Sequence, residues 1–430
     1  MKKSFKLTKL ERSWVLYDVG NSAFTLLVST LLPIYFNALA TSAGIDENMY
    51  LSYWGYAGSI ATILVAIIGP ICGTLSDRRG YKKPLFLLCV ALGVLGCAAL
   101  GLAKGWLIFL GIFIIGKVGF NGSLVFYDSM LPEITTEERI DNVSTQGYAW
   151  GYIGSVVPFV ICLVLVLAGG SFGLDQTAAM VIAFIITALW WVIFTVPLTR
   201  SYHQTAYVER GEHPIADTFR QIWNTFRKAK EQKHVFVYLI AFFFFINGVY
   251  TIIDMATAYG SALGLDTTGL LLALLLTQVV AFPCAIIFGR LSAKYDTGLL
   301  IKICIVCYTC ITAFGMFLVT LWQFWVLATL VGMFQGGVQA LSRSYLGKII
   351  PAERSGEFYG LMDICGKGAS FVGTTLVAVV SQATAGITVD VFGITLQNEN
   401  LAVGSLIVLF IIGFVIFCKA DQLNKERVRQ

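Results

Sequence analysis

Charged and amide side chains recur at helical spacing inside long apolar segments of this 430-residue sequence. Lys117, Asn121 and Asp128 fall at i, i+4 and i+11, so they share one face of a helix. A charge at the centre of a bilayer costs about 2.5–3.5 kcal/mol and therefore faces a partner or a water-filled cavity. Such side chains can hold a polar solute or carry a proton. Lys117 predicts an anionic group, a carboxylate or a carbonyl nearby.

Further titratable groups lie near segment ends or pair along one helix. Asp18 lies close to Tyr17 and Asn21; it is a candidate for proton coupling, or it hydrates at the interface or caps an amide. Asp363 and Lys367, at i and i+4, either take part in coupling or satisfy each other as a structural pair.

Asp128 and Arg343 occupy matching places in two halves of the sequence. They either form a cytoplasmic gate pair or extend individually to the interface as snorkelling side chains.

Composition places these groups in a membrane protein. Hydrophobic residues make up 57% and charged residues 13% of the chain, and the mean hydropathy is +0.77. A soluble domain is nearer half apolar and a quarter charged, so the excess apolar surface must face lipid.

A bilayer-spanning helix needs about 20 largely apolar residues. Six such segments come before a polar stretch and six after it, at approximately 13–40, 50–75, 84–103, 106–130, 144–168, 176–198, 235–259, 265–290, 298–320, 322–346, 357–384 and 399–419. We predict an all-α membrane protein of twelve transmembrane helices in two six-helix bundles. The predicted boundaries are 1–198 for the N-terminal bundle, 199–234 for a cytoplasmic linker and 235–430 for the C-terminal bundle.

Loop charge predicts the orientation, because Lys and Arg are retained on the cytoplasmic side. The N-terminus, alternate loops, the linker and the C-terminal tail are basic, whereas the opposite loops carry Lys104 as their one basic residue. Both termini are therefore expected in the cytoplasm. The formal net charge of +5 is concentrated on that side and does not favour nucleic-acid binding.

Within the linker, an amphipathic helix is expected after Pro214. Its apolar face would carry Ile215, Phe219, Ile222, Trp223 and Phe226. It lies on the cytoplasmic leaflet or packs beneath the bundle; the pattern leaves both open.

The sequence repeats weakly at half its length. The stretch beginning at Gly73 is echoed by the one beginning at Gly289, and Glu138-Arg139 is echoed by Glu353-Arg354. Two parallel six-helix halves are typical of transporters whose site lies between the halves at the bilayer midplane.

The stretch 73–83, with sequence GTLSDRRGYKK, resembles the loop signature of the major facilitator superfamily between helices two and three. The resemblance implies that Asp77 faces the N-terminus of helix eleven, where free amides favour an anion, and latches the cytoplasmic side. Arg78 belongs to the same gating group. Gly73 would allow close helix approach and Gly80 a tight turn, and we expect the basic cluster to anchor the turn at anionic headgroups.

A narrower resemblance is to the autophagy-related, vacuolar-effluxer-like branch, associated with export of neutral amino acids. It is carried by the stretches 14–24, 131–134, 147–149, 339–344 and 357–360. One departure is Asn247-Gly248, where the branch usually has Asp-Gly, which puts coupling at this position in doubt. Helices one, four, seven and ten line the central cavity of the superfamily, so we expect substrate contacts from Tyr17, Asn21, Lys117, Asn121, Asn247, Tyr250, Gln335 and Gln339.

Other chemistries lack their residues. The stretch 111–118 nearly matches a nucleotide-binding loop, but Val118 replaces the required Ser or Thr and the stretch is embedded in a membrane segment. The histidines all lie in the linker region, and Cys304, Cys307 and Cys310 sit in an apolar run without turns. We predict no enzyme activity, no metal and no cofactor.

The sequence as a whole predicts a monomeric secondary transporter in the cytoplasmic (inner) membrane, in contact with membrane lipids. It would move a small zwitterionic or amphiphilic solute, favouring an amino-acid-like one, by alternating access with possible proton coupling. A transport-inactive sensor or scaffold of the same fold, or a facilitative channel or uniporter, stays open as an alternative.

Overall fold

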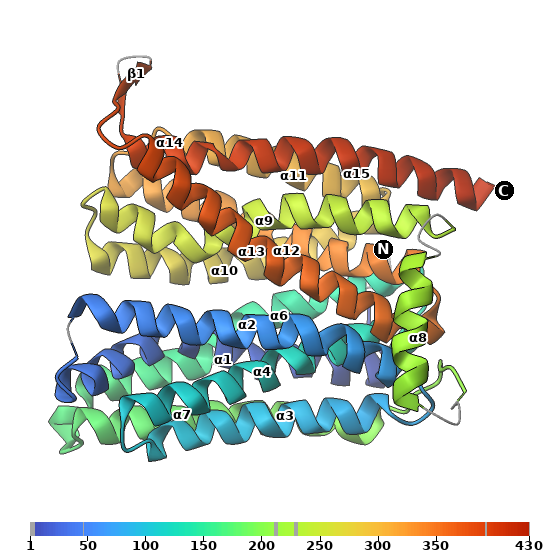
Figure 1. Ribbon diagram of the computed structural model, residues 1–430, viewed down its shortest axis with the longest axis horizontal. Helices are drawn as coiled ribbons and strands as arrows, with labels where there is room; N and C mark the ends of the chain where they lie inside the picture. The colour runs from blue at the N-terminus through green and yellow to red at the C-terminus, as the bar shows by residue number, and fades with distance from the viewer. Residues whose placement is uncertain (1–4, 46, 210–213, 228–230, 392–393, 430) are drawn as a thin grey trace. The chain divides into compact units, whose positions relative to one another are not determined.

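The computed structural model describes residues 5–45, 47–209, 214–227, 231–391 and 394–429. Long helices dominate these residues (Figure 1). The helices before the linker are α1 (Lys9–Ser42), α2 (Glu47–Ser76), α3 (Lys82–Ala99), α4 (Trp106–Ser129), α5 (Leu131–Ile134), α6 (Ile140–Ala168) and α7 (Gln176–Ser201). Those that follow are α8 (Pro214–Arg227), α9 (Lys233–Ala262), α10 (Thr267–Ser292), α11 (Thr297–Gly315), α12 (Leu321–Ile349), α13 (Ser355–Ala383), α14 (Asn398–Gly404) and α15 (Leu406–Arg429).

In the described part of the chain, twelve helical stretches are long and apolar enough to cross a membrane. This count confirms the predicted all-α class with twelve spans. The last predicted segment is divided, because the seven-residue α14 precedes α15.

Side-chain caps explain where several helices begin. Thr8 and Glu11 form a capping box at the start of α1. Thr320 and Gln323 form another at α12, which allows the tight joint after α11. Each box satisfies amide groups that a helix start leaves without partners.

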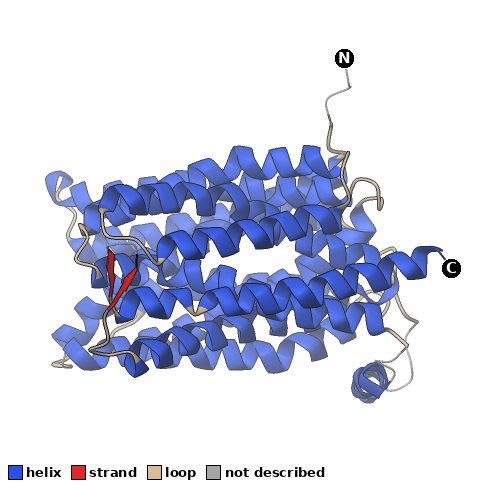
Figure 2. Cartoon of the chain, turned by 90° about the horizontal axis from the view of Figure 1, so that it is seen from above, coloured by secondary structure: helices blue, strands red, loops and turns tan. Residues whose placement is uncertain are grey.

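One β-hairpin lies between α13 and α14. Strand β1 (Val389–Val391) pairs antiparallel with β2 (Ile394–Leu396), with Val389 opposite Leu396. Figure 2 shows this hairpin as the strand pair in an otherwise helical chain. The sequence analysis missed it, because each strand is too short for a clear alternating pattern.

The chain separates into two compact units. The first comprises Met1–Thr136, Trp150–Arg220 and Ala352–Gly360; the second comprises Glu137–Ala149, Gln221–Pro351 and Leu361–Gln430. The start of α6 thus belongs with the second unit and the start of α13 with the first. The division of the sequence at 198 and 235 stays a prediction about the two bundles.

Aromatic stacking forms much of the core of each unit. In the first, Trp14 stacks on Tyr127 with ring centroids 4.3 Å apart, and α1 packs along α7. In the second, Tyr238 contacts Tyr345 at 4.9 Å, and α9 packs along α15 (Figure 1). Such pairs add about 0.5–1.5 kcal/mol each beyond their buried area.

The linker helix α8 presents aromatic side chains outward. Phe219 and Trp223 are 53% and 69% exposed, whereas Thr218 and Thr225 are buried. Exposed aromatics at i and i+4 are what an interfacial helix requires. Placement of α8 on the cytoplasmic leaflet stays a prediction.

Candidate functional site

The signature loop between α2 and α3 contacts the first turn of α13. Asp77 Oδ1 accepts a hydrogen bond from the amide of Gly356 (2.7 Å), and Oδ2 accepts one from the amide of Glu357 (2.9 Å). These are first-turn amides, which have no partner within a helix. The carboxylate therefore caps α13, and it does so from 279 residues away in sequence. We call this contact the Asp77 cap.

Two glycines make the cap possible. A Cβ on Gly73 would lie 2.3 Å from the carbonyl oxygen of Gly356, and one on Gly356 would lie 2.2 Å from that of Gly73. The backbones of α2 and α13 therefore touch at this point, which any larger residue would prevent. Gly80 adopts φ 78°, in the left-handed region that favours glycine, and its amide donates to Gln204 Oε1 (2.9 Å).

A buried lysine lies next to the signature loop and bonds to its neighbours. Lys82 Nζ donates to Glu133 Oε1 (2.6 Å) and Ser355 Oγ (2.8 Å), and it lies 3.8 Å from Asp77 Oδ1. The side chains of Lys82 and Glu133 are 0% and 1% exposed. The expectation that the basic cluster anchors at lipid headgroups is therefore wrong for Lys82, because its charge is neutralised inside the protein.

Burial also changes the acidity of Asp77. Loss of hydration raises the pKa of this carboxyl to about 7, although the Lys82 ammonium and the amides of Glu357 and Gly356 act in the opposite direction. Asp77 lies just outside the membrane-spanning helices, after the end of α2. Because its pKa is raised, it can titrate near neutral pH.

The segment after α7, residues 205–209, forms hydrogen bonds with the same loop and with Glu133. Val208 donates its amide to Asp77 O (2.7 Å) and accepts from the amide of Arg79 (3.1 Å), and Arg78 Nη1 donates to Glu209 O (3.1 Å). Glu133 Oε2 accepts from the amide of Thr205 (2.9 Å). Sequence reasoning did not assign these contacts to Glu133, Lys82 or this segment; the acidic residue in the Leu-Pro-Glu-Ile stretch was the available signal for Glu133.

A polar cluster joins α1 and α4 inside the first unit. Tyr127 Oη donates to Asp18 Oδ2 (2.9 Å), Asn21 Nδ2 lies 3.5 Å from Asp18 Oδ1, and Tyr17 Oη donates to Ser123 Oγ (2.6 Å). The predicted neighbours of Asp18 are therefore near it. The carboxylate is buried and bonded rather than hydrated.

Lys117, Asn121 and Asp128 follow one another along α4. The Lys117 ammonium lies 5.6 Å from the centroid of the Phe113 ring, a cation–π distance. It also approaches Gly58 of α2, where an added Cβ would lie 3.6 Å away. Asn121 is buried and Asp128 partly buried.

The predicted residues of α9 and α12 belong to the second unit. Asn247 is 0% exposed and accepts a hydrogen bond from Thr251 Oγ1 (3.4 Å) through Oδ1. Its Nδ2 has no partner among the described groups. Tyr250 and Gln339 are partly buried and Gln335 is buried. Their predicted role in substrate binding stays a prediction.

Arg343 is held by the start of α6. Its Nε donates to Ser144 Oγ (3.0 Å), its Nη2 donates to Ser144 O (2.9 Å), and its guanidinium lies 4.4 Å from the centroid of Tyr148. On α13, the ion pair expected between Asp363 and Lys367 is present. Asp363 Oδ2 has no further partner within the described residues.

The sequence analysis did not single out Asp141, in the first turn of α6. Its carboxylate accepts hydrogen bonds from Thr297 Oγ1, Ser344 Oγ and Lys348 Nζ, each at 2.6 Å. It lies three residues after the repeated Glu138, which was the one sequence signal near it. Asp141 thereby ties α6 to α11 and α12 within the second unit.

Metal-ligating side chains do not cluster in the described residues: no group of three or more His, Cys, Asp or Glu could hold an ion there. All ten cysteines are free thiols.

A family model described as "Vacuole effluxer Atg22 like" matches residues 8–428 of this chain. The chain belongs to this family. An uncharacterized MFS-type transporter, YxiO of Bacillus subtilis (strain 168), is 38% identical over 430 residues, which cover 99% of this chain and 98% of the relative. Autophagy-related protein 22 of Coccidioides immitis (strain RS) is 22% identical over 424 residues, covering 79% of this chain and 69% of the relative.

Solved structures share the fold of this Atg22-like chain. The human organic anion transporter MFSD10 (TETRAN) has a TM-score of 0.70 at 14% identity and covers 96% of this chain and 100% of its own. The transporter FucP in its outward conformation also has a TM-score of 0.70 at 14% identity, covering 96% and 97%. The 38% identity with an MFS-type transporter over nearly the whole of both chains, together with the twelve spans, makes the protein a multi-pass membrane transporter of the major facilitator superfamily.

Proposed function

We propose that this transporter moves a small zwitterionic or amphiphilic solute, of the amino-acid type, across the cytoplasmic membrane by alternating access. The observation that carries the proposal is the Asp77 cap. Two hydrogen bonds to the Asp77 carboxyl group and a glycine–glycine contact hold the start of α13 against the signature loop. All of these contacts are local to one end of the helices, so they can break and re-form while the helices stay folded.

In this proposal, protons drive transport through Asp18 or Asp128. Asp18 is the better placed of the two, because Tyr127 and Asn21 can reorganise around it when its carboxylate gains a proton. Asp18 lies on α1 and Asp128 on α4, the two helices that carry the polar cluster. Lys117, on α4, binds the carboxylate of the solute.

The experiment is uptake into proteoliposomes, screening neutral amino acids and zwitterionic amphiphiles with and without a pH gradient. We expect saturable, gradient-stimulated uptake of one class. Asp18→Asn or Asp128→Asn should reduce uptake to the level without a gradient and leave solute exchange intact. Asp390→Asn, an exposed carboxylate in the hairpin, is the matched control.

Lys117→Ala should raise the KM at least about tenfold, since a hydrogen bond to a charged group contributes about 1.5–3 kcal/mol. Lys104→Ala, an exposed lysine, should leave the KM unchanged. Saturable uptake that ignores pH would retire coupling and leave a uniporter or exchanger. No transport by folded protein would favour a sensor or scaffold.

A further inference from the structure

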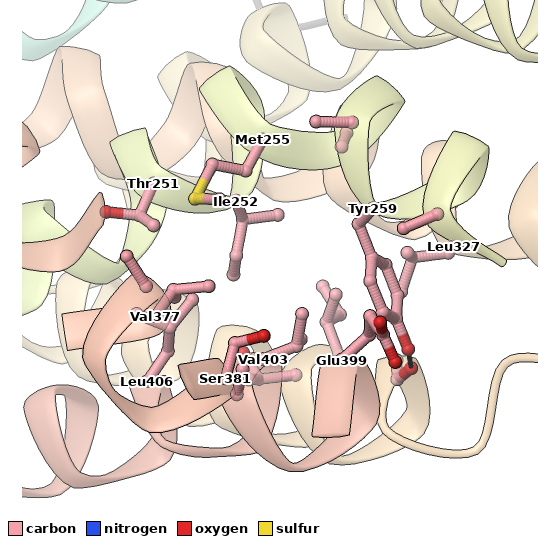
Figure 3. Close-up of a pocket in the computed structure, with 18 residues that line it drawn as sticks. Thr251, Ile252, Met255, Tyr259, Leu327, Val377, Ser381, Glu399, Val403 and Leu406 are labelled. Atoms are coloured by element: carbon pink, nitrogen blue, oxygen red, sulfur yellow. Dashed lines mark hydrogen bonds between the residues drawn. The ribbon is translucent and has the colours of Figure 1, made fainter. Parts of the chain in front are cut away.

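The second unit contains a partly open cavity of about 300 Å³. It lies among α9, α11, α12, α13, α14 and α15, near the ends of these helices that adjoin the β-hairpin. Figure 3 shows its lining, which is mainly aliphatic: Ile252, Met255, Leu327, Val377, Val403 and Leu406. Ligand pockets begin at about this volume.

Several polar atoms in the lining are already hydrogen-bonded to protein groups. Tyr259 Oη donates to Gly315 O (2.8 Å) and accepts from Asn400 Nδ2 (2.9 Å). Thr312 Oγ1 donates to Tyr308 O (2.7 Å). Tyr259 and Thr312 therefore have no donor left for an anionic or strongly polar ligand, whereas Ser381 Oγ accepts from Asn398 Nδ2 (3.2 Å) and keeps its hydroxyl proton.

Glu399 is the exception. It lines the cavity beside Tyr259 (Figure 3), its Oε2 is shielded from solvent, and no described group donates a hydrogen bond to that atom. A shielded carboxylate oxygen without a partner is costly.

From this combination we propose that the cavity binds a compact apolar amine, with its hydrocarbon body among the aliphatic side chains and its ammonium group donating to Glu399. The charge excludes the alternatives. An apolar carboxylate would meet Glu399 with like charge, and a small zwitterion would bring its own carboxylate into an apolar wall. The site lies wholly within one unit, and none of the residues predicted above to bind the solute lines it.

The test measures binding of 1-adamantylamine to the full-length protein in phosphatidylcholine nanodiscs by titration calorimetry. The neutral 1-adamantanol has the same cage and reports on the apolar part alone. We expect the amine to bind at least tenfold more tightly than the alcohol. Glu399→Gln should lower the amine affinity about tenfold and change the alcohol affinity less than twofold. Glu426→Gln, an exposed glutamate on α15, should change neither.

Ala378→Phe fills the cavity from α13 and should weaken both ligands, with an unchanged size-exclusion profile showing that the variant folds. Adding phosphatidylethanolamine to the nanodiscs distinguishes the source of the amine. If phosphatidylethanolamine lowers the binding of 1-adamantylamine, the occupant is an aminophospholipid. If the binding is unchanged, the occupant is a free amine. Amine binding that is undetectable, or that Glu399→Gln and Ala378→Phe both leave unchanged, would overturn the proposal.

Discussion

Asp77 shows how burial converts an ordinary loop carboxyl into a group that responds to pH. A hydrated aspartate has a pKa near 3.9, whereas in the cap the pKa is raised to about 7. The capped state therefore binds the proton more tightly than a state in which the loop is hydrated. The stability of the capped state relative to the hydrated state is greatest below about pH 4 and is lost as the pH rises toward 7.

From this sign we predict that acid favours the cap. Between pH 5 and pH 7 the free-energy difference between capped and hydrated states should change by about 1.4 kcal/mol per pH unit at most. Hydrogen exchange at the amides of Gly356 and Glu357, corrected for intrinsic pH dependence, should accelerate as the pH rises. The same amides in Asp77→Asn should show no such dependence. A wild-type profile as flat as that of the variant would refute the prediction.

At the scale of the element, α2 and the equivalent helix α10 both end in a close glycine contact with another helix. They differ in which helix supplies the buried carboxylate. Gly289, the counterpart of Gly73, packs so closely on the start of α6 that an added Cβ would lie 2.3 Å from Thr145 Oγ1. Ala293 replaces the counterpart of Asp77, however, so α10 offers no capping carboxylate. The buried carboxylate in the second unit is instead that of Asp141 on α6, which accepts three hydrogen bonds.

Helix α2 allows a matched test of the close approach. In Gly73→Ala, the new methyl group would lie 2.3 Å from Gly356 O, so we expect α2 and α13 to separate and the cap to weaken. Overpacking of this kind typically costs about 1–3 kcal/mol. Exchange of the Gly356 and Glu357 amides should rise at least fivefold.

Gly55→Ala is the control for the helix itself, because a Cβ there meets no atom within 4 Å. It should leave exchange at α13 unchanged. Equal exchange in wild type and Gly73→Ala would show that the two backbones do not touch in solution.

At the scale of the whole molecule, the distribution of basic residues predicts which end of the helices faces the cytoplasm. The signature loop, the linker and the C-terminal tail carry half of the Lys and Arg, so they should share that side. The β-hairpin and the cavity near it would then lie at the opposite membrane face.

Reporter fusions test this orientation. Green fluorescent protein fused after Gln430 should fluoresce, and alkaline phosphatase at the same point should be inactive. Phosphatase fused after Gly173, in the loop between α6 and α7, should be active. An active phosphatase at the C-terminus would reverse the assignment.

The sequence alone determined the membrane class, the twelve spans and the family. These properties depend on the length of apolar runs and on local motifs, and both can be read along the chain. The contact of Asp77 with the start of helix eleven was implied by the family resemblance, and the glycines marked where helices approach closely.

The tertiary structure decided the partners of the buried charges. Lys82 lies in a basic loop, and nothing local distinguishes it from its exposed neighbour Arg79; only packing against Glu133 and Ser355 removes it from water. Asp141 and Glu399 likewise acquire their surroundings from helices far away in sequence. Burial and hydrogen bonding are properties of three-dimensional neighbours, which a single sequence does not specify.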